Sequence, residues 1–150
     1  VPLYLRAVAL ENDTRELETA AFAMHCFWVG EMEIGKVPGV VATEAGWMEG
    51  KEVTRVTYDP SSVSLEALRE KAEKAECADK TYEPGPDGLL SGYSAAKESD
   101  QKRQLMRWEA LKKVKNLTPM QLTKLNAFAT VDMDAALAWL SPRQRKALER

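Results

Sequence analysis

Two strand-like segments lie almost end to end in the middle of the chain, and they constrain the fold more than any other feature. Residues 52–60, EVTRVTYDP, alternate between two sets of side chains, and this period of two is typical of a β-strand. The apolar segment VVATEAGWM, residues 40–48, precedes them, and Gly50 and Lys51 form a tight link. So short a link joins antiparallel neighbours. The sequence therefore predicts a β-hairpin, and with it an antiparallel sheet.

A further strand and two helices are expected around this hairpin. ETAAFAM, residues 18–24, is short and apolar, as buried strands are. Residues 27–39 can hold about three helical turns before glycine and proline end them. Residues 61–76 combine serine caps with apolar residues at helical spacing. This order predicts an α+β fold of the ferredoxin-like split βαβ type, with helices on one face of an antiparallel sheet.

The last third of the chain is expected to be mainly helical. AAKESDQKRQLMRWEAL, residues 95–111, has a helical composition, and LKKVKN is a candidate for one more strand. Thr118 followed by Pro119 is a typical helix start. DMDAALAWL and SPRQRKALER are predicted to be two further short helices, each opened by a capping residue.

The composition is that of one globular domain. With 150 residues, 45% of them apolar, the chain can bury a core. We expect residues 1–150 to form a single domain with a core over about residues 17–116 and a C-terminal helical extension over 117–150. No apolar run approaches the roughly 20 residues that cross a bilayer, and the start of the chain lacks the apolar stretch of a secretion signal. The sequence therefore predicts a cytoplasmic protein with no membrane partner.

Charge is divided unevenly along the chain. Residues 1–100 carry 10 Lys and Arg against 19 Asp and Glu, whereas residues 101–150 carry 11 against 4. The basic residues of the C-terminal third come without interleaved aromatic residues or a recognisable binding motif, which argues against a nucleic-acid partner. A solvated face that attracts acidic groups is the preferred interpretation.

Cys26 follows the only histidine, His25, at the point where the first predicted strand meets a helix. A thiol reacts as thiolate, and the free N–H groups and dipole at a helix start lower its pKa. Free cysteine is also among the most buried residue types, so a packed apolar side chain is the alternative. Cys26 and Cys77 fit no metal-binding spacing, and we expect no metal. The residues alone leave both interpretations of Cys26 open.

Three segments in order carry a resemblance to a known family. HCFWVGE, VPGVVATEAGW and GKEVTRVTYDPSSVSLEAL resemble the A-type peptide methionine sulfoxide reductases, which typically show GCFWGxE, a PGV turn, an AGY segment and an ExVxVxYDP strand leading into a helix. The resemblance covers roughly residues 19–77, with a weaker similarity at VKNLTPMQLTKL. It implies reduction of oxidised methionine, free or in peptides, or of a related small sulfoxide. It implies no metal or organic cofactor.

The resemblance implies a role for each of five residues. Cys26 would supply the thiolate that attacks the sulfoxide sulfur, which leaves methionine and a cysteine sulfenic acid. Phe27 and Trp28 would form the slot for the substrate's methyl group. Glu52 aligns with the family's proton donor, a role that suits a carboxylic acid in an apolar cleft. Glu31 matches the last position of GCFWGxE and is expected to have a structural role.

A second thiol would have to resolve the sulfenic acid to a disulfide, which a thioredoxin-like protein can reduce. Cys77 is the only other cysteine and is therefore the candidate resolving residue. The alternative is that Cys77 is a buried structural cysteine at a helix end. Members of the family often carry their resolving cysteines elsewhere, in C-terminal tails.

The chain departs from the family at several points. The segment between AGY and the glutamate, which carries a substrate-facing tyrosine, is missing, and only AGWMEGKE remains. His25 replaces the first glycine of the motif, either as a cation beside the thiol or as an imidazole facing solvent. The family has a second substrate-binding tyrosine later in the chain, and Tyr93 is the candidate for it here. Tyr82 is another candidate, and an alignment on the LTP motif places Ala110 at that position. The alternative function is a non-catalytic redox-sensing or binding module that retains the reactive cysteine.

Overall fold

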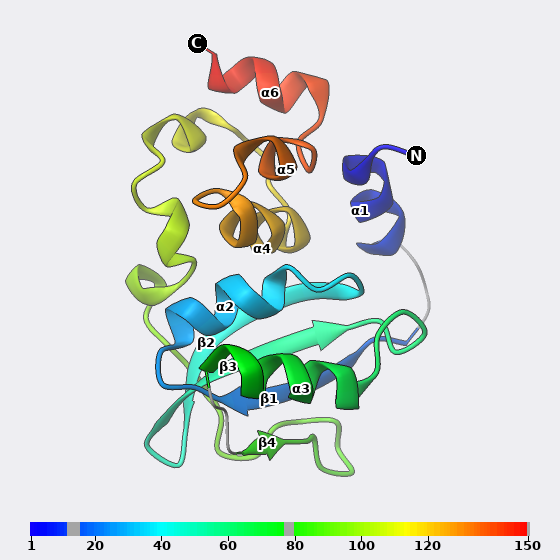
Figure 1. Cartoon of the computed structure of the whole chain (residues 1–150), viewed down its shortest axis with the longest axis vertical. Helices are drawn as coiled ribbons and strands as arrows, with labels where there is room; N and C mark the ends of the chain where they lie inside the picture. The colour runs from blue at the N-terminus through cyan, green and yellow to red at the C-terminus, as the bar shows by residue number, and fades with distance from the viewer. Residues whose placement is uncertain (12–15, 77–79, 150) are drawn as a thin grey trace.

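The computed structural model describes residues 1–11, 16–76 and 80–149, and within them the chain is an α+β structure with a five-stranded antiparallel sheet (Figure 1). The strand order in the sheet is β4-β1-β3-β2-β5. The strands are β1 (Glu18–Ala23), β2 (Val40–Met48), β3 (Lys51–Tyr58), β4 (Thr81–Tyr82) and β5 (Ser94–Ala95). The α-helices are α1 (Leu3–Glu11), α2 (Phe27–Gly35), α3 (Leu65–Glu76), α4 (Pro119–Phe128), α5 (Met133–Leu137) and α6 (Pro142–Leu148). Short 3-10 helices are η1 (Glu98–Asp100), η2 (Arg103–Leu105) and η3 (Glu109–Lys113).

The predicted hairpin is confirmed as β2 and β3, which pair antiparallel as far as Met48 opposite Lys51. The turn between them consists of Glu49 and Gly50, one residue earlier than the predicted link. Both residues have positive φ angles, 52° and 73°. Two-residue hairpin loops favour this conformation at both positions because it matches the right-handed twist of the strands.

The larger part of the core lies between the sheet and the two helices α2 and α3, which cover the same face (Figure 1). α2 lies close against the sheet at Gly30, where an added Cβ atom would lie 2.3 Å from Thr54 Oγ1. The sequence offers Ser61, Ser62 and Ser64 as caps for α3, and the structure uses Ser64, whose hydroxyl accepts the Ala67 N–H at 3.0 Å. Side chains of this core come from β1, α2, β2, β3 and α3: Ala20, Phe22, Met24, Ile34, Val40, Val56, Tyr58, Leu68 and Ala72.

The opposite face of the sheet carries a smaller apolar cluster. Its buried members from the strands include Ala21, Met48 and Tyr82, and the partly buried Leu90 and Tyr93 pack against them. Leu90 and Tyr93, from the segment between β4 and β5, thus pack on the face opposite α2 and α3.

The extra C-terminal helices are present, and each begins where the sequence predicts. Thr118 and Ser141 form capping boxes at the starts of α4 and α6, and Asp132 caps α5. α4 packs against α2 and β2, on the side of α2 away from α3 (Figure 1). The boundary between a core and an extension near residue 116 stays a prediction.

Lys124 of α4 is buried against the C-terminal end of α2, with 2% of its surface exposed. Its ammonium donates to the carbonyl oxygens of Gly35 at 2.8 Å and Val37 at 3.0 Å. It also lies 5.5 Å from the centre of the Trp139 ring. Burial lowers the pKa of Lys124 to about 8, because a charged ammonium is poorly solvated in the interior.

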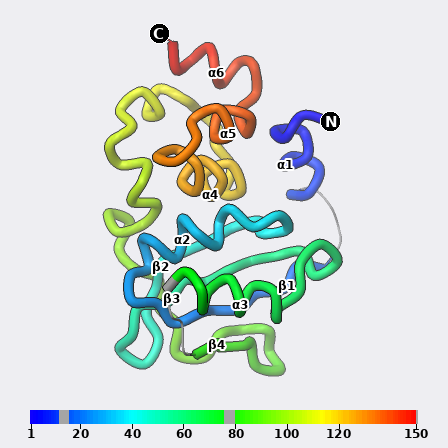
Figure 2. Tube along the Cα trace, viewed as in Figure 1, coloured from blue at the N-terminus to red at the C-terminus, as the bar shows by residue number. Residues whose placement is uncertain are grey.

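Two predictions for the segment before α4 are wrong. Residues 95–111 form β5 and separate 3-10 turns instead of an α-helix, and LKKVKN continues η3 into extended backbone without pairing as a strand. Figure 2 shows this segment running from the sheet past the start of α2 to reach α4. Tertiary contacts of Gln101 and Lys102, given below, hold the backbone out of a helix. No helix among the described residues combines the length and apolar character needed to span a membrane.

Candidate active site around Cys26

Cys26 is the last residue before α2, and its extended backbone, with φ −145° and ψ 113°, places it at the helix N-cap. Its carbonyl accepts the Gly30 N–H at 3.0 Å, while its side chain makes no capping hydrogen bond. The thiol is partly exposed and is not part of a disulfide. The predicted location between a strand and a helix is therefore confirmed, at the helix end where negative charge is stabilised.

Glu52 reaches this same helix start from the sheet. Its Oε1 atom accepts the backbone N–H of Phe27, the residue next to Cys26, at 3.0 Å. Its own carbonyl oxygen accepts the N–H of Met24 at 2.9 Å, on the other side of Cys26. Two hydrogen bonds thus fasten the start of β3 to both ends of the short connection that carries the thiol. The structure places the carboxylate of the predicted acid against the residue that follows the predicted nucleophile.

Aromatic rings line the site beside this carboxylate. Phe27 is buried, and its ring centre lies 6.2 Å from that of Trp28. Trp47 of β2 meets Phe27 edge to face, with the ring centres 5.3 Å apart. Trp47 was not among the site residues predicted from the sequence. The hairpin register, which pairs Trp47 with Glu52, is the signal that could have identified it.

A segment distant in sequence fixes the orientation of Trp28. Its indole N–H donates to the Asp100 carbonyl oxygen at 2.9 Å, and the Arg103 guanidinium lies 4.7 Å from the centre of its ring. Gln101 pairs with the edge of β2 as a strand would, because its side-chain amide accepts the Ala45 N–H and donates to the Ala45 carbonyl oxygen, both at 2.8 Å. No sequence signal pointed to Asp100, Gln101 or Arg103 as neighbours of the site.

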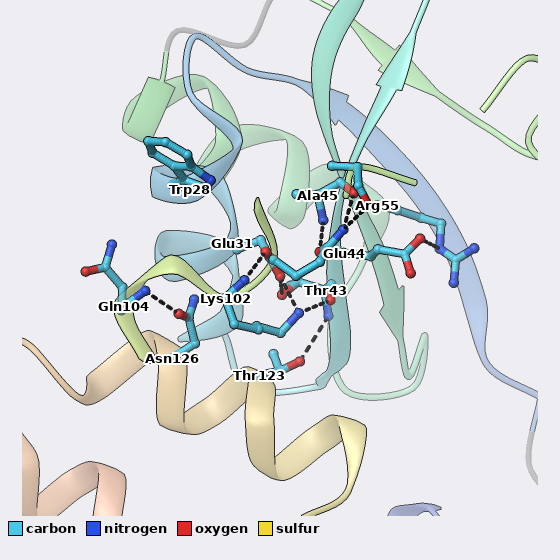
Figure 3. A network of polar contacts seen from close by, with 12 residues as sticks. Trp28, Glu31, Thr43, Glu44, Ala45, Arg55, Lys102, Gln104, Thr123 and Asn126 are labelled. Carbon is cyan, nitrogen blue, oxygen red and sulfur yellow. Dashed lines mark hydrogen bonds and ion pairs between the residues drawn. The ribbon is translucent and has the colours of Figure 1, made fainter. Parts of the chain in front are cut away.

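A buried polar network continues from this segment into α2 (Figure 3). The Glu31 carboxylate is completely buried and accepts the Thr43 hydroxyl at 2.8 Å and the Lys102 backbone N–H at 3.0 Å. It also forms an ion pair with the Lys102 ammonium, which donates in addition to the Thr43 carbonyl oxygen. Glu31 has the contacts of a structural residue, and these contacts hold residues 100–103 against α2.

Comparison with known proteins shows a partial similarity to one family. The alignment with the peptide methionine sulfoxide reductase MsrA of Geobacter metallireducens is 40% identical over 74 positions and covers 38% of this chain and 46% of the relative. The alignment with the MsrA of Methanoculleus marisnigri is 36% identical over 90 positions and covers 49% of this chain and 55% of the relative. The matched part of the chain is thus similar to A-type peptide methionine sulfoxide reductases.

The similarity to these reductases is confined to part of each protein. The chain spans about half the length of these curated relatives. A peptide methionine sulfoxide reductase of Brassica napus is 36% identical over 66 residues, 33% of this chain and 26% of the relative. No family model matches the chain.

Tyr93 lies on the opposite side of the sheet from the aromatic rings of the candidate site. Its hydroxyl donates to the Glu44 carboxylate, and its ring lies so close to Gly46 that an added Cβ atom would stand 2.3 Å from it. Along β2 these residues alternate with Ala45, which packs against Phe27. Burial and the neighbouring Glu44 raise the pKa of Tyr93 above its usual range. No contact joins it to Cys26 in the described structure, so its role in substrate binding stays a prediction.

The remaining predicted residues are placed as follows. Cys77 lies outside the described residues, so its resolving role is not tested. His25 is exposed. Tyr82 is buried on the same face as Tyr93, and its hydroxyl has no hydrogen-bond partner in the described structure. Among residues 1–11, 16–76 and 80–149, no group of three His, Cys, Asp or Glu side chains is arranged to hold a metal ion.

Proposed function

We propose that this chain reduces methionine sulfoxide, free or in peptides, or a related small sulfoxide, with Cys26 as the nucleophile. The observation that carries the proposal is the hydrogen bond from the Phe27 N–H to the Glu52 carboxylate. It supports a site in which a thiol and a proton donor face the same small region at the start of α2. The names of the similar proteins, peptide methionine sulfoxide reductases, agree with this proposal.

In the proposed reaction the Cys26 thiolate attacks the sulfur of the sulfoxide while Glu52, in its protonated form, donates a proton to the oxygen. The sulfur–oxygen bond of the substrate breaks as a cysteine sulfur–oxygen bond forms. The substrate sulfur is reduced by two electrons and the Cys26 sulfur is oxidised by two. The products are the thioether and a Cys26 sulfenic acid. Phe27 and Trp28 would hold the methyl group of the substrate.

A thiol then condenses with the sulfenic acid, and water leaves as a disulfide forms. Cys77 is proposed as that thiol, and a thioredoxin-like dithiol would reduce the resulting disulfide. Such a cycle suits a reducing compartment such as the cytoplasm. In solution, a small dithiol such as dithiothreitol can replace both Cys77 and the thioredoxin-like protein.

The proposal extends to the fold. We infer a ferredoxin-like core in which β1-α2-β2 and β3-α3-β4 are two interleaved split βαβ units. The strand order β4-β1-β3-β2 supports this inference, because one strand separates the two strands of each unit.

The test is an activity assay with dithiothreitol and either free or peptide-bound methionine sulfoxide. We expect the wild type to form methionine and Cys26→Ser to form none. Without reductant, the wild type should release about one methionine per chain and leave a sulfenic acid or disulfide that mass spectrometry detects. Equal product from Cys26→Ser, or no product from the wild type, would overturn the proposal.

The second candidate function is a redox-sensing module that does not turn over. The position of Tyr93 favours this alternative. Its hydroxyl donates to Glu44 on the face of the sheet opposite Ala45 and the Phe27 ring, so it is not placed to bind a sulfoxide oxygen at the proposed site. It predicts that mild peroxide oxidises Cys26 while no sulfoxide is reduced.

A further inference from the structure

Trp47 is the only exposed aromatic side chain among the described residues, and it lies beside the proposed site. With 40% of its surface exposed, it contrasts with the buried Phe27 ring that it contacts. Its place next to Phe27 and opposite Glu52 is what sets this exposed ring apart from the other exposed apolar side chains.

The hairpin register sets the direction of this side chain. Trp47 is the direct cross-strand partner of Glu52, so the two side chains lie on the same face of the sheet. Both converge on Phe27, since Glu52 binds its backbone N–H while Trp47 meets its ring. The hairpin turns back after only Glu49 and Gly50, so the loop between Trp47 and Glu52 is too short to fold over them.

The Trp47 side chain has a free surface and a free donor. Its edge-to-face contact with Phe27 is its only ring contact in the described structure, and its indole N–H has no hydrogen-bond partner there. A ring of this kind offers apolar area to a ligand at little conformational cost, because it has only two side-chain torsions.

We propose that Trp47 is a specificity-determining residue that contacts the substituent of the sulfoxide other than its methyl group. This inference rests on the proposed reductase function. The site then favours sulfoxides whose second substituent is aromatic or otherwise apolar over those in which it is small. A peptide substrate would be favoured when apolar residues flank its oxidised methionine.

The test compares methyl phenyl sulfoxide with dimethyl sulfoxide, because the two share the reacting group and differ in the second substituent. Initial rates with dithiothreitol give KM and kcat for the wild type, Trp47→Ala and Trp47→Phe. We expect Trp47→Ala to raise KM for methyl phenyl sulfoxide about tenfold, with kcat within about threefold, and to change KM for dimethyl sulfoxide less than threefold. Trp47→Phe should retain most of the preference.

The matched control is Met133→Ala, which removes a large apolar side chain of similar exposure, 42%, from α5. It should leave both sets of constants unchanged. Circular dichroism and thermal melting verify that each variant is folded. If Trp47→Ala impairs the two sulfoxides equally, or impairs neither, the inference is wrong.

A binding measurement separates failure of this inference from failure of the proposed function. If the wild type reduces neither sulfoxide, the reductase proposal fails. Saturation-transfer NMR with Cys26→Ser and methyl phenyl sulfoxide then tests the contact alone. Binding that weakens about tenfold in Cys26→Ser/Trp47→Ala supports the contact, and unchanged or absent binding overturns it.

Discussion

The buried carboxylate of Glu31 and the ammonium of Lys102 form an ion pair between residues 71 positions apart in the chain. One partner lies in α2 and the other in the irregular segment that follows β5. Lys102 has a left-handed backbone with φ 48°, and its N–H donates to the same carboxylate. The pair therefore positions the segment that also binds Trp28 through Asp100.

Lys102→Met should lower the free energy of unfolding by about 3 kcal/mol, because it leaves the Glu31 charge buried without its counter-ion. Urea denaturation measures this loss. Lys112→Met is the control, since Lys112 and Glu109 form an exposed pair whose removal should cost less than about 0.5 kcal/mol. The double variant Glu31→Gln/Lys102→Met should recover part of the stability. A loss below about 1 kcal/mol in Lys102→Met would contradict this role.

Glu52→Gln should separate the structural role of this side chain from its proposed chemistry. The amide oxygen of glutamine can still accept the Phe27 N–H, but the amide cannot donate a proton as a carboxylic acid does. We expect kcat for sulfoxide reduction to fall about 10²- to 10⁴-fold, with thermal stability nearly unchanged. Glu49→Gln, in the hairpin turn nearby, is the control. Wild-type turnover by Glu52→Gln would show that another group supplies the proton.

Gly30→Ala should destabilise the fold although alanine favours a helix. The new methyl group would stand 2.3 Å from Thr54 Oγ1 and 2.9 Å from Met24 Cγ, so α2 would have to move away from the sheet. We expect a net loss of about 1–3 kcal/mol in chemical denaturation. Thr54→Ala should relieve this clash at small cost, because the buried Thr54 hydroxyl has no hydrogen-bond partner in the described structure. Identical losses with and without Thr54→Ala would contradict the packing argument.

Lys124 should make stability rise between pH 8 and pH 10. Its pKa is about 8 in the folded chain and 10.5 in the unfolded chain, so the unfolded state binds the extra proton over this interval. The free energy of unfolding should increase by about 2–3 kcal/mol, because the cost of the buried charge disappears as Lys124 loses its proton. Below pH 8 the residue is charged in both states and contributes no pH dependence.

Lys124→Met should lack this rise, and urea titrations of both proteins at several pH values measure the difference. Tyr58 acts in the opposite direction above about pH 10, because burial and Glu18 raise its pKa to about 12 and the folded state then holds the extra proton. The contribution of Tyr58 to the free energy of unfolding is the same in the wild type and in Lys124→Met, so it cancels when the two pH profiles are compared. Parallel pH profiles for wild type and Lys124→Met would show that Lys124 does not titrate in this range.

The sequence by itself determined the elements whose signals are local. The period-two pattern and short link specified the β2–β3 hairpin, and Ser64, Thr118 and Ser141 marked helix starts because a capping hydroxyl needs only the next turn of backbone. The position of Cys26 followed from the same local boundary between strand and helix. Its pairing with Glu52 came from the family resemblance and from no local signal.

Tertiary structure decided everything that depends on contacts between distant segments. Residues 95–111 have a helical composition, yet Gln101 satisfies the edge of β2 and Lys102 satisfies Glu31, and these buried bonds outweigh helix propensities of a fraction of a kcal/mol per residue. The same kind of contact holds Tyr93 against Gly46 and away from the aromatic site, and places Trp47 against Phe27. The burial of these side chains and their contact partners are set only when strands and helices from distant parts of the chain pack together, so no single segment encodes them.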